Sequence, residues 1–278
     1  MVKIIVSFLL FFTVLNAGEI DKKALLNEKI KLIVGEKVFI KHSSELKRIF
    51  SKTSRYYIKN RVNIMRVASR LRSTGYMKLR FREPKDLTIS FKATTNPMFF
   101  VKIMSDTLRT IGYYRYVTTH SSLDNREFTW TITLKTESAT NPVTLQNKLL
   151  QSSCKIVGIK RNSATNWEYT IDTSHARLNV KKLRRATVLK LKRSLYAHWL
   201  NVSKIKKLSI ESGERNLWYP QVTYYDSSLH ILKVYKKDKK TDKIVFRMPK
   251  NSVYMKISDM NSMKNLKDDL VFNPIGYR

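Results

Sequence analysis

The side chains that most often perform catalysis or bind metals are scattered in this sequence. The five histidines show neither an H-x-x-x-H nor an H-E-x-x-H spacing, so no single helix presents two of them to a metal: they are His42, His120, His175, His198 and His230. The sequence also lacks G-x-S-x-G, a P-loop and G-x-G-x-x-G, and its 7 glycines leave little room for a loop that holds phosphate through backbone amides. We therefore expect no metal site and no cofactor.

The carboxylates do not form an evident acid–base pair either. Asp268 and Asp269 are adjacent, so on a helix they would point in different directions. Glu211 and Glu214 flank Gly213, which predicts a turn rather than two groups facing each other across a cleft. An acid–base pair formed by carboxylates that are distant in the sequence remains an alternative. On balance the sequence predicts a protein that is not an enzyme.

The single cysteine, Cys154, restricts covalent chemistry further. One thiol forms no intramolecular disulfide and cannot build a cysteine-based zinc cluster. We expect Cys154 to be a small buried residue at the end of a helix. A reactive thiol, or a disulfide between two chains in an oxidising compartment, remains an alternative.

Charge is the strongest compositional signal. The chain has 54 Lys and Arg against 21 Asp and Glu, a formal net charge of +33, which favours a polyanionic partner. Two runs concentrate the charge: Lys41–Lys85 has only Glu45 and Glu83 as acids, and Arg177–Lys207 has none. Either run could instead be a solvated face. The candidate polyanion-binding residues are Lys181, Lys182, Arg184, Arg185, Lys190, Lys192, Arg193, Arg61, Arg66, Arg70 and Arg72.

The first residues, MVKIIVSFLLFFTVLNAGEI, predict a secretory signal peptide. Lys3 supplies the positive start, Ile4–Leu15 is the apolar run, and small residues favour cleavage near Ala17. The alternative is a retained membrane anchor, but the apolar run is shorter than the ~20 residues that a spanning helix needs. We expect an exported, periplasmic or secreted protein without a transmembrane segment in the mature chain.

Three stretches share one pattern of a helix followed by two strands. Asn96-Pro97 and Asn141-Pro142 combine an N-cap side chain with proline at the first helical position. Gly75 and Gly112 follow helical patterns, where a left-handed C-cap conformation suits glycine. Alternating strand patterns come next, with turns predicted at REPKD, SSLDNRE and NSATN. The sequence thus predicts tandem αββ modules, of which the third matches least well because Cys154 stands in place of the glycine.

The rest of the chain has a different pattern. The stretch Arg177–Leu200 is basic and predicts a connector, helical or extended. If helical, it could also attach to an anionic membrane surface. From Val202 onward, short strand patterns separated by loop signals predict a small β-sandwich.

This last part resembles the closing strands of galactose-binding-like, jelly-roll β-sandwich modules. The likeness rests on LSIES, LWYPQVTYYDSSLHILKVY and IVFRMPKNSVYMKISD, in which Met248–Ser258 resembles the final strand of those modules. It implies a binding accessory, often for glycans. Three aromatic residues are candidates for stacking on sugar rings: Trp218, Tyr219 and Tyr225. The whole chain also resembles uncharacterised exported bacterial proteins, which implies no function.

The predicted fold class is α+β, with tandem helix–strand–strand modules followed by a small all-β sandwich. The predicted segments are a signal peptide (1–17), an N-terminal helical segment (18–54), three αββ modules (55–94, 95–138 and 139–176), a basic connector (177–201) and the sandwich (202–278). We predict an exported, non-catalytic scaffold of the bacterial cell envelope. Its partner would be proteins of an envelope machine, such as a flagellar motor or secretion complex, or an anionic cell-wall or surface glycan. The alternative is a protein that binds nucleic acid outside the cytoplasm, through basic runs and aromatic stacking.

Overall fold

The computed structural model describes residues 21–277 of the 278-residue chain. The chain divides into two compact units after Arg177, here called the N-terminal and C-terminal units. The predicted signal peptide lies outside the described residues. Within residues 21–277 no helix has both the length and the apolar character needed to cross a membrane.

The N-terminal unit begins with short helices. A helix covers residues 21–34, and Gly35, with a φ of 85°, turns the chain into α2 (Glu36–Lys41) and α3 (Ser43–Ile49). Leu26, Ile30 and Ile33 recur at helical spacing on the first helix and are buried. A 3-10 turn, η1 (Thr53–Tyr56), and the short hairpin β1 (Tyr57–Ile58) and β2 (Arg61–Val62) follow.

Helix α4 (Ile64–Ser73) is amphipathic. Ile64, Val67, Ala68 and Leu71, at positions i, i+3, i+4 and i+7, are all buried. This apolar face packs against α6 (Pro142–Leu149) and β6 (Lys155–Arg161). The opposite face of α4 therefore points away from the core.

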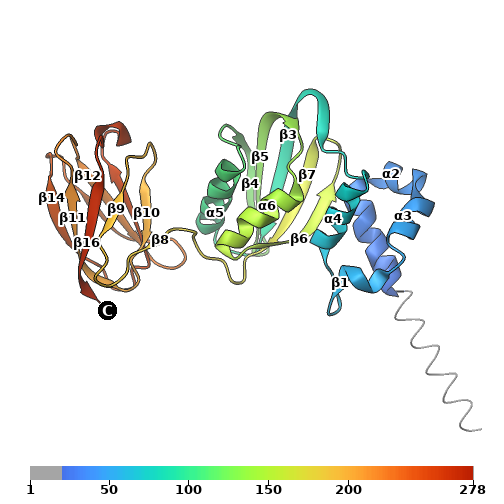
Figure 1. Ribbon diagram of the computed structural model, residues 1–278, viewed down its shortest axis with the longest axis horizontal. Helices are drawn as coiled ribbons and strands as arrows, with labels where there is room; N and C mark the ends of the chain where they lie inside the picture. Colours follow the sequence, from blue (N-terminus) through green and yellow to red (C-terminus); the bar gives the residue numbers. More distant parts are fainter. Residues whose placement is uncertain (1–20, 278) are drawn as a thin grey trace, which may run out of the picture. The chain divides into compact units, whose positions relative to one another are not determined.

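One five-stranded sheet organises the N-terminal unit. Its order is β4 (Val117–Asp124), β5 (Glu127–Ser138), β3 (Arg80–Ala93), β7 (Asn166–Asp172) and β6, and only the β3–β7 pair is parallel. Helices α5 (Pro97–Thr110) and α6 lie across one face of the sheet (Figure 1). The predicted α+β class is confirmed, and the αββ segments share this single sheet rather than forming separate domains.

The capping residues predicted from the sequence stand at the ends of the helices. The Asn96 side chain accepts hydrogen bonds from the backbone N–H groups of Met98 and Phe99, at 3.0 and 3.3 Å, and the Asn141 side chain accepts one from Val143. Proline occupies the first helical turn in both cases. Gly75 and Gly112 have φ values of 81° and 96°, as a left-handed C-cap requires. These local predictions are confirmed.

The first module differs from its prediction. The residues predicted as a turn, Arg82–Asp86, lie inside the single long strand β3, and the pairing register with β5 shifts between Arg80 and Lys85. Pro84 cannot donate a backbone hydrogen bond, and such a residue is tolerated in a strand where the pairing is irregular. The first helix is therefore followed by one strand, and β3 becomes the centre of the sheet instead of half of a hairpin.

The two faces of the sheet have opposite characters. The face beneath the helices carries the aromatic side chains, which are all buried: Phe91, Phe128, Trp130, Trp167 and Tyr169. The other face carries hydroxyl-bearing residues, joined across strands by Thr88–Thr133 and Ser90–Thr131 hydrogen bonds of 3.2 and 2.9 Å. Strict alternation along β3, β5 and β7 produces this segregation.

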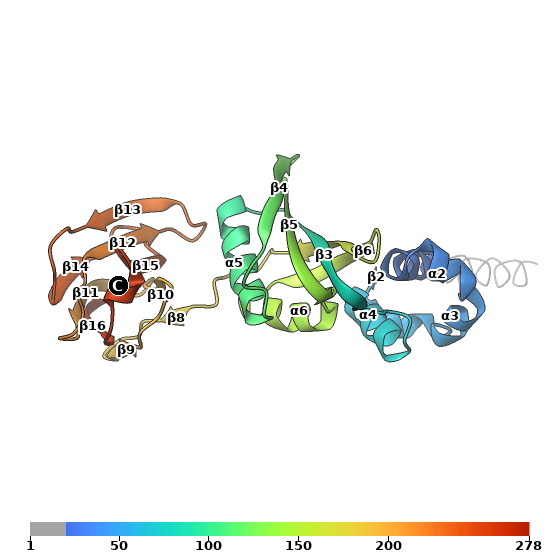
Figure 2. The ribbon, with the colours of Figure 1, turned by 90° about the horizontal axis from the view of Figure 1, so that it is seen from above.

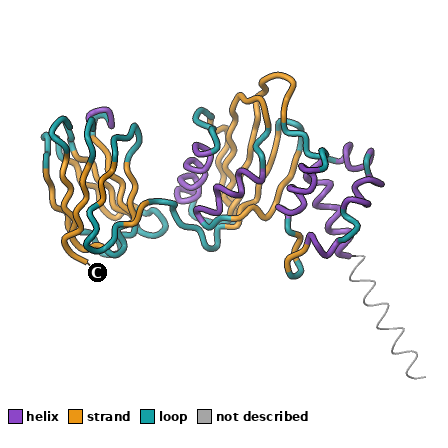
Figure 3. The backbone as a smooth tube through the Cα atoms, viewed as in Figure 1, coloured by secondary structure: helices purple, strands orange, loops and turns teal. Residues whose placement is uncertain are grey.

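The C-terminal unit is a β-sandwich (Figures 2 and 3). One sheet has the order β13-β12-β15-β10-β8 and the other β14-β11-β16-β9. The elements are β8 (Lys181–Lys182), β9 (Leu189–Leu191), β10 (His198–Asn201), β11 (Ile205–Ser212), β12 (Pro220–Tyr225), β13 (Ile231–Lys236), β14 (Lys243–Arg247), β15 (Tyr254–Asp259), η3 (Met263–Asn265) and β16 (Leu270–Tyr277). Side chains of both sheets form one core, in which Tyr224 meets Phe246 across the gap at a ring-centroid distance of 6.2 Å.

The stretch predicted as a basic connector, residues 177–201, belongs to the C-terminal unit from Leu178 onward. It contains β8, β9 and β10, which join both sheets, and no helix. Of the leucines that an interfacial helix would use, Leu183 and Leu191 belong to the shared core, whereas Leu195 is 63% exposed. Because this stretch forms strands and loops, the interfacial-helix alternative is wrong. At the other end, β16 follows β15, so Met248–Ser258 does not form the last strand.

Candidate anion-binding site

A basic hollow lies between α3, η1 and α4 of the N-terminal unit. Its volume is about 560 Å³. It is lined by five cationic side chains and three serines, with two apolar or aromatic residues between them: Arg48, Lys52, Arg55, Arg66, Arg70, Ser51, Ser69, Ser73, Ile49 and Tyr56. No carboxylate lines it.

Helix α4 supplies one wall through its exposed face. Arg66, Ser69, Arg70 and Ser73 stand at i, i+3, i+4 and i+7, the same spacing as the buried residues but on the opposite side of the helix. Because burial of the apolar face fixes the rotation of α4, it also fixes the direction of these polar side chains. The Asn63 side chain accepts a hydrogen bond from the Arg66 backbone at 3.1 Å and anchors the start of the helix.

The end of α3 and the turn η1 supply the other wall. Beneath them, Phe50 and Tyr56 pack with ring centroids 4.6 Å apart, which holds the chain in a tight reversal. Across the hollow, Arg66 Nη1 donates to the carbonyl oxygen of Arg55 at 3.0 Å. This bond links the two walls and orients the Arg66 guanidinium.

The lining of the hollow has a net positive charge, and Glu45, which interacts electrostatically with Arg48, is not among the lining residues. Among residues 21–277, none of its five cations forms an ion pair with a carboxylate. Arginine presents several N–H donors in a planar fork that matches phosphate, sulfate or carboxylate, and serine hydroxyls add further donors. The arrangement is suited to holding an anion, and it offers no nucleophile–base pair.

The structure places two of the four arginines predicted from the Lys41–Lys85 run at this site. Arg66 and Arg70 line the hollow, whereas Arg61 and Arg72 are exposed elsewhere. Arg48, Lys52 and Arg55 line it too but were not among the predicted residues. The signal in the sequence was the polar stripe of α4 at helical spacing, but the residues of the facing wall could be selected only once α3 and η1 were placed.

The seven basic residues predicted from the Arg177–Lys207 run belong to the C-terminal unit and are not concentrated in one hollow. All of its residues are exposed: Lys181, Lys182, Arg184, Arg185, Lys190, Lys192 and Arg193. Lys181 and Lys182 lie on β8 and Lys190 on β9, edge strands of two different sheets. Arg185 lies 5.4 Å above the Tyr277 ring, a cation–π contact within the sandwich.

The aromatic candidates have different environments. Trp218 is fully buried in the sandwich core and donates from its indole N–H to the Ser258 carbonyl at 3.1 Å, so the prediction that it stacks on a ligand is wrong. Tyr219 is half-buried. Tyr225 is 7% exposed and stacks on Trp199, with ring centroids 5.1 Å apart.

The open face of the N-terminal sheet does not expose the aromatic rings of β3, β5 and β7 that stacking on single-stranded nucleic acid would require. Proteins that use this mode expose aromatic rings on an open sheet face. Here the rings of β3, β5 and β7 all lie beneath the helices, and the open face carries hydroxyl groups. After α5, outside the sheet, Tyr114 is 70% exposed and Tyr116 donates to Ser105 Oγ at 3.0 Å.

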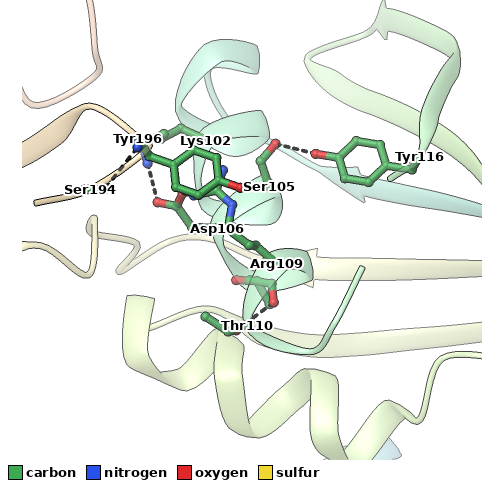
Figure 4. A network of polar contacts seen from close by, with 9 residues as sticks. Lys102, Ser105, Asp106, Arg109, Thr110, Tyr116, Ser194 and Tyr196 are labelled. Atoms are coloured by element: carbon green, nitrogen blue, oxygen red, sulfur yellow. Dashed lines mark hydrogen bonds and ion pairs between the residues drawn. The ribbon is translucent and has the colours of Figure 1, made fainter. Parts of the chain in front are cut away.

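A second hollow of about 630 Å³ lies beside α5 and the start of β4. Figure 4 shows its surroundings, where Asp106 forms ion pairs with Lys102 and, at 3.7 Å, with Arg109. Arg115 and Lys135 also line it, but so does Asp86. Its charge is mixed, so the smaller hollow is the better anion site.

The remaining reactive groups are dispersed or buried. In the part of the chain that the structure describes, no three His, Cys, Asp or Glu side chains come close enough together to hold a metal. His230 contacts Asp226 at 2.8 Å in a local turn. Cys154 is completely buried just after α6 and η2 (Leu150–Ser152), and burial followed by the nearby Asp172 charge raises the pKa of its thiol to about 11. Ser153 adopts the left-handed conformation that glycine provides in the other modules.

Comparison with known proteins adds little. No protein-family model and no curated protein matches the chain. One solved structure, "Crystal structure of accessory secretory protein 1,2 and 3 in Streptococcus pneumoniae", has 13% sequence identity and covers 33% of this chain and 82% of that one, with a TM-score of 0.19. A superposition at that score does not establish a shared fold.

Proposed function

We propose that this protein is a non-catalytic binding protein of the bacterial cell envelope, and that its basic hollow holds an anionic glycan. One observation carries the proposal: five cations and three serines converge on a single hollow that no carboxylate lines. The signal-like N-terminal sequence supports the export part of this proposal, and the galactose-binding-like resemblance of the C-terminal unit stays a prediction.

An anionic glycan fits this hollow better than the alternative ligands do. A polymer that carries sulfate, phosphate or carboxylate groups would place an anionic group in the hollow, and the rest of the polymer would extend along the positively charged surface. Nucleic acid would also supply phosphates, but proteins that bind single strands tightly combine phosphate contacts with exposed aromatic rings on which the bases stack. Those rings are buried in the sheet of the N-terminal unit.

The experiment compares the purified protein with two double variants. Arg66→Gln with Arg70→Gln removes two cations from the hollow, and Arg61→Gln with Arg72→Gln removes the same charge from exposed positions outside it. The probes are dextran sulfate, polygalacturonate, neutral dextran and a single-stranded oligonucleotide, with affinity measured by calorimetry at several salt concentrations.

We expect affinity for one of the anionic glycans to fall by about tenfold or more in the hollow variant and only slightly in the matched control. Neutral dextran should not bind. The slope of log affinity against log salt should be smaller by roughly 2 in the hollow variant, because two fewer cations release counterions.

Equal losses in both double variants would show that overall charge, not the hollow, does the binding. Tighter binding of the oligonucleotide than of either glycan would favour the nucleic-acid alternative. Capture of an envelope protein without any glycan binding would support the scaffold prediction with a protein partner and reject the glycan.

A further inference from the structure

The second hollow, of about 630 Å³, has no part in the proposed function. It lies between α5, the residues that follow this helix, and the strands β3, β4 and β5. Its volume is in the range of pockets that hold small molecules. Its lining includes three tyrosines, a lysine, an arginine and one carboxylate that a ligand can contact: Tyr113, Tyr114, Tyr116, Lys135, Arg115 and Asp86.

Two of the tyrosine rings are held in place by other side chains. The Tyr116 hydroxyl donates to Ser105 Oγ at 3.0 Å (Figure 4), and its ring makes an edge-to-face contact with Trp130, with ring centroids 5.7 Å apart. The Tyr113 hydroxyl accepts a hydrogen bond from Thr140 at 3.0 Å. Side chains that are already fixed lose little conformational freedom when a ligand binds.

The third ring, Tyr114, is open to solvent and is 70% exposed. None of the described Lys and Arg side chains makes a cation–π contact with Tyr113, Tyr114 or Tyr116. Groups of aromatic rings recognise quaternary ammonium ions, which have no N–H donors to offer to a carboxylate or a hydroxyl group. The three rings therefore suit a methylated ammonium group.

Opposite charges stand next to each other where the sheet lines the hollow. Asp86 on β3 and Lys135 on β5 are direct partners in the antiparallel pairing, and both are exposed. The Cβ atoms of such partners lie about 5 Å apart. Arg115 is exposed as well, and among the described residues none of these three forms an ion pair. Arg109, which also lines the hollow, pairs with Asp106 at 3.7 Å.

We propose that this hollow binds a phosphocholine group, whose trimethylammonium is held by the tyrosine rings and Asp86 and whose phosphate is held by Arg115 and Lys135. A ligand with only negative charge is repelled by Asp86, and a ligand with only positive charge is repelled by the cations. A zwitterion satisfies both. The short ethylene link of phosphocholine keeps its two charges close together, as the charges of Asp86 and Lys135 are.

The rings decide between phosphocholine and phosphoethanolamine, which carry the same charged groups but differ in the methylation of the amine. A primary ammonium has three N–H donors and is best held by several oxygen acceptors. The hollow is lined by one carboxylate and three tyrosines. We therefore expect it to prefer the methylated amine, which gains more from the rings.

Calorimetry on the purified protein tests the preference with four probes: phosphocholine, phosphoethanolamine, choline and inorganic phosphate. We expect phosphocholine to bind about tenfold or more tightly than each of the others. Equal affinity for inorganic phosphate would show a second plain anion site, and equal affinity for phosphoethanolamine would show that the rings do not read the methyl groups. Either result, or no binding of phosphocholine, would overturn the proposal.

Asp86→Asn separates a zwitterion site from an anion site. It should weaken phosphocholine binding about fivefold and strengthen the binding of inorganic phosphate, because the same carboxylate attracts the ammonium and repels the phosphate. Asp124→Asn, at an exposed aspartate on β4 outside the hollow, is the matched control and should change neither affinity. Tighter binding of phosphocholine by Asp86→Asn would refute the assignment.

Tyr114→Ala removes the exposed ring, so the core is left intact. It should weaken phosphocholine binding about three- to tenfold and leave phosphate binding unchanged, while Tyr114→Phe, which keeps a ring, should bind phosphocholine normally. Arg66→Gln with Arg70→Gln, in the basic hollow, should not affect phosphocholine, so this test is independent of glycan binding. Unchanged affinity in Tyr114→Ala, or a loss in the double variant, would contradict the proposal.

The phosphocholine group could belong to a lipid or to a soluble molecule, and vesicle flotation distinguishes the two. Phosphatidylcholine vesicles have no net charge, so the surplus of positive charge on the protein does not by itself attach it to them. Flotation that Tyr114→Ala abolishes assigns the group to a lipid, whereas binding of free phosphocholine without flotation assigns it to a soluble carrier. Flotation that persists in Tyr114→Ala would count against this hollow as the site.

Discussion

Arg66 donates a hydrogen bond from Nη1 to the backbone carbonyl oxygen of Arg55, at 3.0 Å. The two residues stand on opposite walls of the basic hollow, one on α4 and the other on the turn before it. The bond uses one edge of the guanidinium and leaves the others for an incoming anion, so Arg66 serves both to join the walls and to bind.

This double role predicts that lysine cannot replace Arg66. In Arg66→Lys the charge is kept, but a single ammonium cannot present the planar fork to the anion while it bonds to the Arg55 carbonyl. We expect glycan affinity between that of the wild type and that of Arg66→Gln, by calorimetry. Arg72→Lys, on the same helix but outside the hollow, is the control. Full affinity in Arg66→Lys would show that charge alone matters.

Trp218 should behave as a core residue and not as a binding residue. Its ring is fully buried and its indole N–H bonds to the Ser258 carbonyl. We expect Trp218→Ala to lower the free energy of unfolding by about 3–5 kcal/mol, measured by urea denaturation. Tyr219→Ala, at a half-buried neighbour, should cost less. A Trp218→Ala protein that is as stable as the wild type but binds glycan more weakly would contradict this assignment.

The Cys154 thiol should stabilise the fold only while it is protonated. Burial raises the pKa of the thiol to about 11 from a reference value of 9.0, so the folded state favours the neutral form. The stabilisation is complete below pH 9 and is lost as the pH rises from 9 towards 11.

The measurement is the free energy of unfolding against pH for the wild type and Cys154→Ala. Other groups titrate in the same range, so the difference between the two curves isolates the thiol: it should change between pH 9 and 11 and stay constant below. Iodoacetamide should label Cys154 only as fast as the protein opens. Rapid labelling of the folded protein would show that the thiol is accessible.

Gly213 should tolerate no side chain, because Asp268 lies against it. A Cβ at position 213 would lie 2.4 Å from the Cβ of Asp268, which is held by Arg215 through its backbone N–H at 3.0 Å and its Nε at 2.8 Å. We expect Gly213→Ala to lower the free energy of unfolding by about 1–3 kcal/mol. Gly276→Ala is the control, since its nearest contact would be 3.3 Å. Equal thermal stability of the two variants would contradict this reading.

Much of the local structure could be predicted from the sequence because it depends on neighbouring residues. The Asn-Pro pairs begin α5 and α6, and Gly75 and Gly112 end helices in the left-handed conformation. These features require only backbone sterics and one side-chain hydrogen bond within a few residues. Helical and alternating periodicity likewise identify the element types and hence the α+β class.

Pairing between distant segments was not predictable in the same way. Strand β3 is predicted as two short strands around a charged, proline-containing stretch, but β5 pairs with Arg80 and again from Lys85 onward, which joins the two parts into one strand. Likewise, the leucines of residues 177–201 fit a helix or a strand, and only the sandwich shows that Leu183, Leu191 and Leu200 are core residues of a strand-containing segment.

The amino-acid sequence by itself determined which segments are helices and strands, which of their faces are apolar, and that the molecule carries a large positive charge. Only the tertiary structure decided that Arg48, Lys52 and Arg55 meet Arg66 and Arg70 in one hollow, that Trp218 lies in the core, and that β4 is an edge strand. The physical reason is range: propensity and periodicity act over a few residues, whereas a site or an edge depends on which distant segments pack together.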